Sequence, residues 1–267
     1  MACKRILECS LLNGSKALEM TKIYIGCSGF HYKEWKDIFY PEKLPQTKWF
    51  HFYCEQFNTL ELNVTFYKFP TEKSLSKWYN SSPDDFKFSV KAPRLITHYK
   101  VFNDCKRMLN DFYDSISAGL QRKIGCVLFQ MTPKLAYSAE KLTLIIESVN
   151  PSFQNVFEFR HESWWNEHVF AEFKKHGLIF CGSSFPNLPD EVIQTSQKLY
   201  YRLHGVPVLY KSVYPEKFIN SMYHQIEKKK YDEAWIYFNN TWGDAAIINS
   251  RYLQSLVNKD GSLAATF

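Results

Sequence analysis

The sequence lacks several features that would place the protein in a specialised class. Its 267 residues contain no apolar run near the roughly 18 residues that a membrane-spanning helix requires. The seven cysteines form no CxxC pair, and no histidine stands at zinc-finger spacing. A glycine-rich phosphate loop is also missing, so we expect no nucleotide cofactor. Several cysteines fall within apolar strand patterns, where free thiols act as small hydrophobes, and we expect a reducing, cytoplasmic environment.

The composition is that of a globular protein with a mild positive charge. Hydrophobic residues make up 45% of the chain, aromatic residues 17%, and the formal net charge is +6. Such a charge weakly favours anionic partners and is equally consistent with solubility. No basic tail of the kind that binds nucleic acid is present, and the lysine run at 228–230 suits the end of a predicted helix.

A short apolar strand pattern followed by a helical pattern repeats along most of the chain. The strand patterns cover residues 23–28, 59–65, 86–91, 124–130, 156–160, 178–183, 199–204 and 234–239. Capping residues that precede apolar periodicity predict helix starts at Pro45, Thr71, Asp104, Ser138, Ser163, Pro215 and Asp244.

This rhythm predicts a single (β/α)8 TIM-like barrel domain over residues 23–258. An N-terminal extension at 1–22, partly ordered at most, would precede it, and a C-terminal tail at 259–267 would follow it. A doubly wound open sheet is the structural alternative.

Alternation along the strands sorts their side chains into a helix-facing set and an interior set. In the second strand pattern, Leu60, Leu62 and Val64 are expected to pack under helices. The same period places the following polar or charged side chains inside: Glu61, Asn63, Thr65, Lys87, Ser89, Lys91, Glu158, Arg160, Arg202, His204, Tyr237 and Asn239.

Most of these polar residues come late in their strands, and the carboxyl ends of the strands form the active-site face of such barrels. Glu158 and His204 are candidate acid/base groups, and Lys91 is a third. Schiff-base formation is a less favoured role for Lys91, which requires neighbours that lower its pKa. The candidate ligand-binding residues are Tyr32, Glu61, Asn63, Gln130, Arg160, His161, Arg202, Asn239 and Asn240.

A purely structural explanation competes with this site. Glu61 and Glu158 could pair with the arginines as a buried ion network that only fills the interior. His161 could cap the helix that follows it, while Trp164 and Trp165 are more typical of helix packing than of a stacking wall. Barrel interiors normally use branched apolar residues, so we favour the site.

A series of short motifs runs through the chain. They are IGCSGFHY at 25–32, LELN at 60–63, VLFQ at 127–130, FEFRHESW at 157–164, RLHG at 202–205 and YFNN at 237–240. Together they resemble the YecE-like family, a domain of unknown function numbered 72, over about residues 23–256. The resemblance implies an α/β barrel and no settled activity.

Four positions depart from the family's pattern. Phe30 stands in place of the usual Trp, and Cys27 in place of a Thr. Ser183 and Ser184 occupy the end of the sixth strand pattern, where the family commonly has an Asp. If that Asp has a chemical role elsewhere in the family, this chain lacks it.

Three interior cations, Lys91, Arg160 and Arg202, stand against two interior acids, Glu61 and Glu158. This balance predicts a site for an anionic ligand, since arginine suits bidentate binding of phosphate or carboxylate. We expect an enzyme that acts on a phosphorylated or otherwise anionic compound by metal-independent acid/base chemistry, of the hydrolase, lyase or isomerase type.

Alternatives stay open. A metal-dependent, nuclease-like barrel would use Glu61, Glu158, His204 and His161 as ligands, although the neighbouring cations oppose a divalent ion. The protein could also bind an anionic ligand without catalysis, and no membrane partner is expected. Nucleic-acid binding would use the aromatic residues predicted near the mouth, namely Tyr32, Trp35, Tyr67, Trp164 and Trp242.

Overall fold

The structure is a computed structural model that describes residues 21–259. Its strands are β1 (Lys22–Cys27), β2 (Thr59–Leu62), β3 (Lys87–Lys91), β4 (Ile124–Gln130), β5 (Gln154–Glu158), β6 (Ile179–Phe180), β7 (Gly182–Ser184), β8 (Lys198–Leu203) and β9 (Glu233–Phe238). All pairings between them are parallel, in one sheet of order β1-β9-β8-β7 and another of order β2-β3-β4-β5-β6. Nearly all of the predicted N-terminal extension and all of the predicted tail except Lys259, which ends α8, lie outside the described residues.

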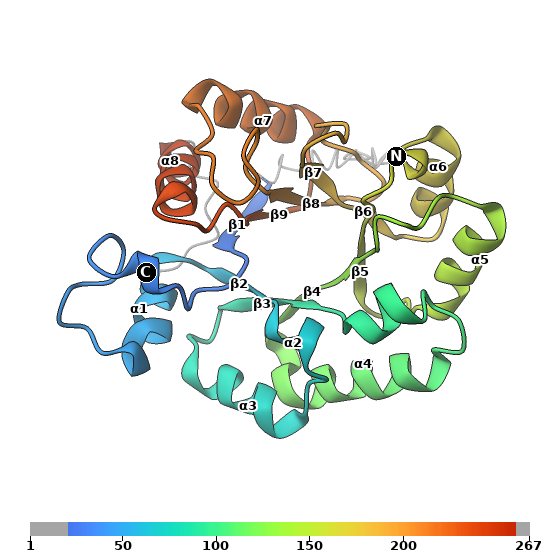
Figure 1. Ribbon diagram of the computed structural model, residues 1–267, viewed down its shortest axis with the longest axis horizontal. Coiled ribbons are helices and arrows are strands. Elements are labelled where there is room, and N and C mark those ends of the chain that lie inside the picture. The colour runs from blue at the N-terminus through green and yellow to red at the C-terminus, as the bar shows by residue number, and fades with distance from the viewer. Residues whose placement is uncertain (1–20, 260–267) are drawn as a thin grey trace, which may run out of the picture.

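Helices connect the strands and lie outside them (Figure 1). They are α1 (Trp49–Gln56), α2 (Val64–Tyr67), α3 (Glu72–Ser81), α4 (Lys106–Leu120), α5 (Ala139–Ser148), α6 (Glu167–Lys175), α7 (Glu216–Lys229) and α8 (Ala245–Lys259). Short 3-10 turns occur at Lys33–Trp35, Gln46–Lys48, Gln121–Lys123 and Glu162–Trp164, and a π-helical turn at Leu95–Tyr99. Within residues 21–259, every helix is too short or too polar to cross a membrane.

The predicted α/β fold with parallel strands is confirmed, but a continuous closed ladder is not found. The strands surround one interior (Figure 1), yet the sixth predicted strand is interrupted at Cys181, and its halves β6 and β7 belong to different sheets. No backbone ladder joins β1 to β2 among the described residues. Instead, the Asn58 side chain accepts from the Ile25 amide at 3.0 Å and donates to the Ile23 carbonyl at 3.2 Å. Closure into an eight-stranded barrel therefore stays a prediction.

Alternation along the strands produces two separate apolar cores. One lies between the strands and the helices, and the other is enclosed by the strands. At the amino ends, Tyr24 stacks on Trp235 with ring centroids 3.8 Å apart and fills the enclosed core. Gly125 makes room for this pair, because a Cβ there would lie 2.5 Å from the Trp235 ring. This stacked pair thus occupies the enclosed space at the amino ends of β1 and β9.

The second strand ends earlier than predicted. β2 stops at Leu62, and Thr65 lies in the short helix α2, so its predicted interior position is wrong. The Thr65 hydroxyl instead donates to the Lys91 carbonyl at 2.6 Å. Val64, predicted to pack under a helix, is 55% exposed. Strand alternation fails at this point because Asn63 already has helical backbone angles.

Most predicted helix starts are confirmed, including the capping box that Thr71 forms with Ser74. Two are wrong. Asp104 does not cap α4, which begins after Cys105, and its own φ is 46°. The helix predicted from Ser163 begins four residues later at Glu167, because the side chain of Asn166 caps it by accepting from the Val169 amide.

Candidate functional site

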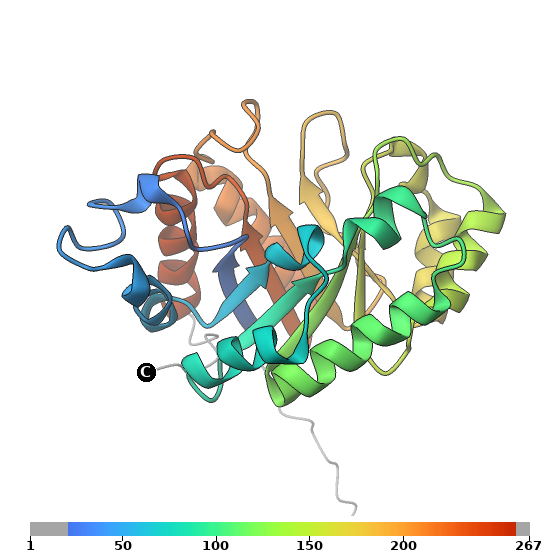
Figure 2. The ribbon, with the colours of Figure 1, turned by 60° about the horizontal axis from the view of Figure 1, so that its bottom comes forward.

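The carboxyl ends of β1, β2, β3, β8 and β9 surround a cavity of about 630 Å³. In Figure 2 the strand arrows point toward this face, where the longer connecting loops gather. Six of the predicted site residues line the cavity: Tyr32, Glu61, Asn63, Lys91, Arg202 and Asn239. The structure therefore brings these six side chains together at one cavity.

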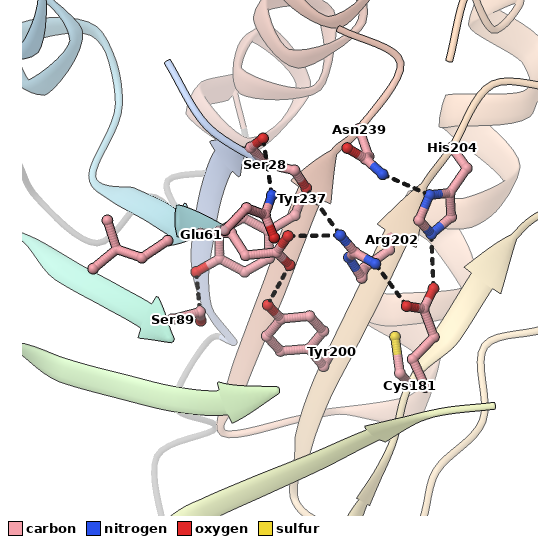
Figure 3. Close-up of polar contacts among 12 residues, drawn as sticks. Ser28, Glu61, Ser89, Cys181, Tyr200, Arg202, His204, Tyr237 and Asn239 are labelled. Atoms are coloured by element: carbon pink, nitrogen blue, oxygen red, sulfur yellow. Dashed lines mark hydrogen bonds and ion pairs between the residues drawn. The ribbon is translucent and has the colours of Figure 1, made fainter. Parts of the chain in front are cut away.

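Arg202 is the centre of a buried ion network. Its Nη1 donates to Glu158 Oε2 and its Nη2 to Glu61 Oε1, both at 2.6 Å, and all three side chains are at most 1% exposed. The Tyr200 hydroxyl donates to Glu61 Oε2 at 2.7 Å (Figure 3). Burial alone would lower the pKa of Arg202, but Glu158 and Glu61 outweigh it and hold that pKa well above its usual range. The guanidinium is therefore permanently charged and fixed in place.

A second branch of the network runs through His204. Its Nε2 lies 2.7 Å from Glu158 Oε1, and its Nδ1 lies 2.8 Å from Asn239 Nδ2 (Figure 3). Arg160 Nη2 lies 3.0 Å from Glu158 Oε1. Burial would raise the pKa of Glu158, but Arg160, Arg202 and His204 hold it well below its usual range. Glu158 thus stays charged at neutral pH and is a poor proton donor.

His204 is expected to stay neutral down to about pH 4, because burial first and Arg160 second lower its pKa to about 3. The neutral ring donates from Nε2 to Glu158 and accepts from Asn239 at Nδ1. Nitrogen-15 NMR of the imidazole, recorded from pH 8 to pH 4, should show this single tautomer throughout. A His204 signal that titrates near its ordinary pKa of 6.5 would contradict the assignment.

Lys91 differs from the other charged residues of the cavity. Its backbone is fixed at the end of β3 by Thr65, and its Nζ lies 4.2 Å from the centroid of the Phe66 ring. Within residues 21–259, no carboxylate forms an ion pair with this amine and no acceptor binds it. Burial, followed by the charge of Arg202, lowers the pKa of Lys91 to about 7. The amine can therefore exchange a proton at neutral pH.

Six predicted site residues lie outside the cavity lining. Glu158, Arg160 and His204 belong to the buried network that contacts Arg202 and Asn239, while the other three have partners elsewhere. Gln130 Nε2 donates to the Met131 carbonyl, and Asn240 Nδ2 donates to the Ser212 carbonyl and to Asn249. His161 Nδ1 accepts from the Ser163 amide at the start of the 3-10 turn Glu162–Trp164. The capping explanation of His161 is thus the one that the geometry supports.

The aromatic residues predicted near the mouth differ in exposure. Trp35 and Trp164 are fully buried, and Trp164 stacks on Phe159 with centroids 4.0 Å apart, so helix packing explains it. Tyr67 and Trp242 are exposed at 70% and 60%. Tyr32 lines the cavity and donates to the Ser28 carbonyl.

The two serines at the family's Asp position are fully buried. Neither the Ser183 nor the Ser184 hydroxyl has a partner among the described residues. Ser183 is paired in register with Arg202 on the neighbouring strand. No carboxylate from this position therefore reaches the network.

Sequence reasoning missed other cavity-lining residues. His31 lies in the IGCSGFHY motif, which was a signal for it, whereas Trp78 and Tyr210 come from α3 and from the loop after β8. The interior position of Tyr200 follows from the same alternation that placed Arg202 inside. A helix residue and a loop residue have no strand periodicity, so no comparable signal marks them.

The proposed metal ligands have protein partners. Glu61 and Glu158 both accept hydrogen bonds from Arg202, and His204 and His161 bond to Glu158 and Ser163. In the described part of the chain, no group of three or more His, Cys, Asp or Glu side chains is arranged to hold a metal ion. The five described cysteines are free and buried.

Comparison with known proteins places these observations in a family. The family model described as "Protein of unknown function DUF72" matches residues 24–266. The chain belongs to the DUF72 family. The resemblance to YecE-like proteins is thereby confirmed, while the family description gives no activity.

DUF72 relatives include the UPF0759 protein YunF of Bacillus subtilis, which is 24% identical over 88% of this chain and 95% of its own length. The UPF0759 protein YecE of Escherichia coli is 26% identical over 42% of each chain. Among solved structures, the DUF72 protein TM1631 of Thermotoga maritima superposes with a TM-score of 0.80, at 25% identity, over 89% of this chain and 99% of its own. A DUF72 protein of Enterococcus faecalis, EF0366, gives 0.76 at 16% identity, over 88% and 95%. These similarities support the fold.

Proposed function

We propose that this DUF72 protein is an enzyme that binds a small anionic compound in the cavity and moves a proton through Lys91. The observation behind the proposal is the Lys91 amine itself, which lines the cavity without a carboxylate partner and has a pKa of about 7. A general acid or base works best when its pKa lies near the working pH. Perturbed groups in a cleft are typical of functional sites.

The charge balance supports an anionic ligand. Glu61 and Glu158 are balanced by Arg202 and Arg160, so an ammonium on Lys91 adds an uncompensated positive charge. A bound anion would offset that charge and stabilise the protonated form. Asn63 adds a fixed polar group, because its Nδ2 donates to the Ser28 carbonyl while its Oδ1 has no partner among the described residues.

The roles first expected for Glu158 and His204 change in this proposal. Glu158 accepts from Arg202, Arg160 and His204 and stays charged, while His204 stays neutral between Glu158 and Asn239. We assign both to positioning rather than to proton transfer. They fix Arg202 and Asn239 at the cavity wall, which preorganises the charges that a reacting anion meets.

We further propose that the two sheets together act as one TIM-like barrel. Asn58 and the Tyr53 hydroxyl bridge β1 and β2, and Cys181 joins β6 directly to β7. A barrel explains why polar groups from β2, β3, β8 and β9 meet at a single carboxyl-end face.

Unbiased ligand capture tests the proposed function. Purified wild-type protein is incubated with a metabolite extract, and retained compounds are identified by mass spectrometry beside Lys91→Met and Gln130→Ala. We expect anionic compounds to be enriched by the wild type and by Gln130→Ala, whose side chain lies outside the cavity lining. Lys91→Met should retain at least about tenfold less, since it lacks the charge. A ligand held equally by all three proteins, or a neutral one, would refute the proposal.

A further inference from the structure

Exposed apolar side chains gather on one side of this molecule. Within residues 21–259, eleven of the twelve large apolar side chains that are exposed belong to segments that follow β1, β2, β3, β8 or β9. These are the strands whose carboxyl ends surround the cavity. The twelfth, Ile248, lies in the first turns of α8. Exposed apolar surface on the segments around a single cavity makes this end of the strands the candidate for a docking surface.

The three most exposed members are aromatic, and each has a cation on its ring. Arg94 lies 5.7 Å from the Tyr67 centroid and 5.6 Å from the Tyr99 centroid. Lys211 Nζ lies 4.8 Å from the Trp242 centroid. We call these five residues the mouth rim. Tyr67, Tyr99 and Trp242 are 70%, 65% and 60% exposed, so much of their surface is open to solvent beside the cations.

The mouth rim is held by its backbone. Tyr99 ends the π-helical turn that begins at Leu95, and the Lys100 amide bonds to the Leu95 carbonyl at 2.9 Å. The Trp242 amide donates to the Tyr210 carbonyl at 3.1 Å, which ties the loop after β9 to the loop after β8. Rigid aromatic side chains lose little conformational entropy when a ligand stacks on them.

The rim segments are also positively charged. Residues 63–70, 92–104, 205–214 and 239–244 carry four cations, Lys68, Arg94, Lys100 and Lys211, against the acids Asp104 and Asp244. Tyr67 and Tyr210 both line the cavity and are exposed outside it. Through Tyr67, the rim therefore adjoins the cavity that Lys91 lines.

We propose that the mouth rim binds a single-stranded polynucleotide, whose bases stack on Tyr67, Tyr99 and Trp242 and whose phosphates face Arg94 and Lys211. The proposal rests on the proposed function of the cavity, and it specifies the anionic compound as one nucleotide unit of such a strand. Aromatic platforms beside cations are the arrangement that binds unpaired bases without sequence preference. In a duplex the faces of the bases are covered by stacking, so a duplex offers no open base to the three rings.

Fluorescence anisotropy with labelled oligothymidylate, oligouridylate and a DNA duplex tests this proposal. We expect both single strands to bind at about 50 mM salt and to lose roughly tenfold or more in affinity at about 200 mM. The duplex should bind at least about tenfold more weakly. A preference between the two single strands would identify DNA or RNA as the partner.

Variants separate stacking from charge. Trp242→Ala and Tyr99→Ala should each weaken binding roughly tenfold, whereas Trp242→Phe should retain it because a phenyl ring still stacks. Arg94→Ala should weaken binding and reduce the dependence on salt. Ile248→Ala, an exposed apolar residue outside the rim segments, is the matched control and should bind like the wild type.

Several results would overturn the proposal. They are equal binding of duplex and single strands, no binding at low salt, and full binding by Trp242→Ala and Tyr99→Ala together. If oligonucleotides fail to bind, two further assays identify the occupant. Sedimentation with phosphatidylserine vesicles that Trp242→Ala abolishes would assign the rim to a membrane. Self-association that Trp242→Ala abolishes would assign it to a second copy of the chain. Trp242 lies outside the cavity lining, so Trp242→Ala should lose oligonucleotide affinity and keep the retention of a single nucleotide, whereas Lys91→Met should lose the retention of a single nucleotide. A failed cavity and a failed rim therefore give different results.

Discussion

Replacement of Lys91 by methionine is expected to raise the free energy of unfolding at pH 7, by about 2–4 kcal/mol. In the wild type, burial and the charge of Arg202 lower the pKa of this amine from 10.5 to about 7. Between these two values the unfolded chain binds a proton that the folded chain does not, so wild-type stability rises with pH across this window. At and below pH 7 the full penalty of a buried ammonium is present. Methionine keeps the length of the side chain and its packing on Phe66 without that penalty.

Urea unfolding at about pH 7 and about pH 10 measures this effect. The two proteins should differ most at the lower pH and converge as the pH approaches 10.5, because the unfolded lysine then also loses its proton. Lys68→Met is the control, since Lys68 is exposed, and it should change stability by less than about 0.5 kcal/mol. If Lys91→Met were less stable than the wild type at pH 7, Lys91 would be a structural ion and not the proton carrier of the site.

The stability that Lys91→Met is expected to gain indicates a function for Lys91. A residue that destabilises the fold and yet lines a cavity is typical of sites where activity and stability conflict. By contrast, the arginines and carboxylates below it form ion pairs with one another. The Lys91 experiment therefore separates the functional explanation of the interior charges from the purely structural one.

The interior positions of the site could be predicted from sequence because strand alternation is a local property. Glu61, Lys91 and Arg202 each lie within a strand whose other face is apolar, and the period of two placed them inside. A pairing of the two carboxylates with the arginines could be expected, but not which arginine pairs with which acid, because Arg202 reaches Glu61 across the interior from a strand 141 residues away in the chain. For the same reason, the sequence could not show that Lys91 is the charge without an ion-pair partner among the described residues of the site.

Alternation gave the wrong result where a strand had already ended. The period of two placed Thr65 inside, but β2 ends at Leu62 and Thr65 lies in α2. Asn240 after β9 and His161 after β5, which the period did not place, have backbone or side-chain partners outside the cavity lining. The residue at which a strand ends depends on the segments that pack against it, which is a property of the tertiary structure.

Arg202→Met is expected to cost about 3–5 kcal/mol of unfolding free energy, the largest loss among the site residues. Removing the guanidinium leaves Glu61 and Glu158 in an interior where both are fully buried. A buried carboxylate without a counter-ion either stays charged with an unfavourable desolvation free energy or takes up a proton. Both destabilise the fold at neutral pH. Denaturant unfolding at pH 7 measures the loss.

Two comparisons decide whether this loss comes from unpaired charge rather than from lost packing. Arg122→Met breaks a 2.7 Å ion pair with Asp84 in which the two side chains are 58% and 92% exposed. It should lower the free energy of unfolding by less than about 1 kcal/mol. Adding Glu61→Gln and Glu158→Gln to Arg202→Met removes the stranded charges and should recover a large part of the stability, because neutral replacement of a whole buried network is often tolerated. A triple variant no more stable than Arg202→Met alone would mean that the network fixes the interior by shape. Recovery of the fold without capture of an anionic ligand would instead show that the two carboxylates and Arg202 are retained for the chemistry around Lys91.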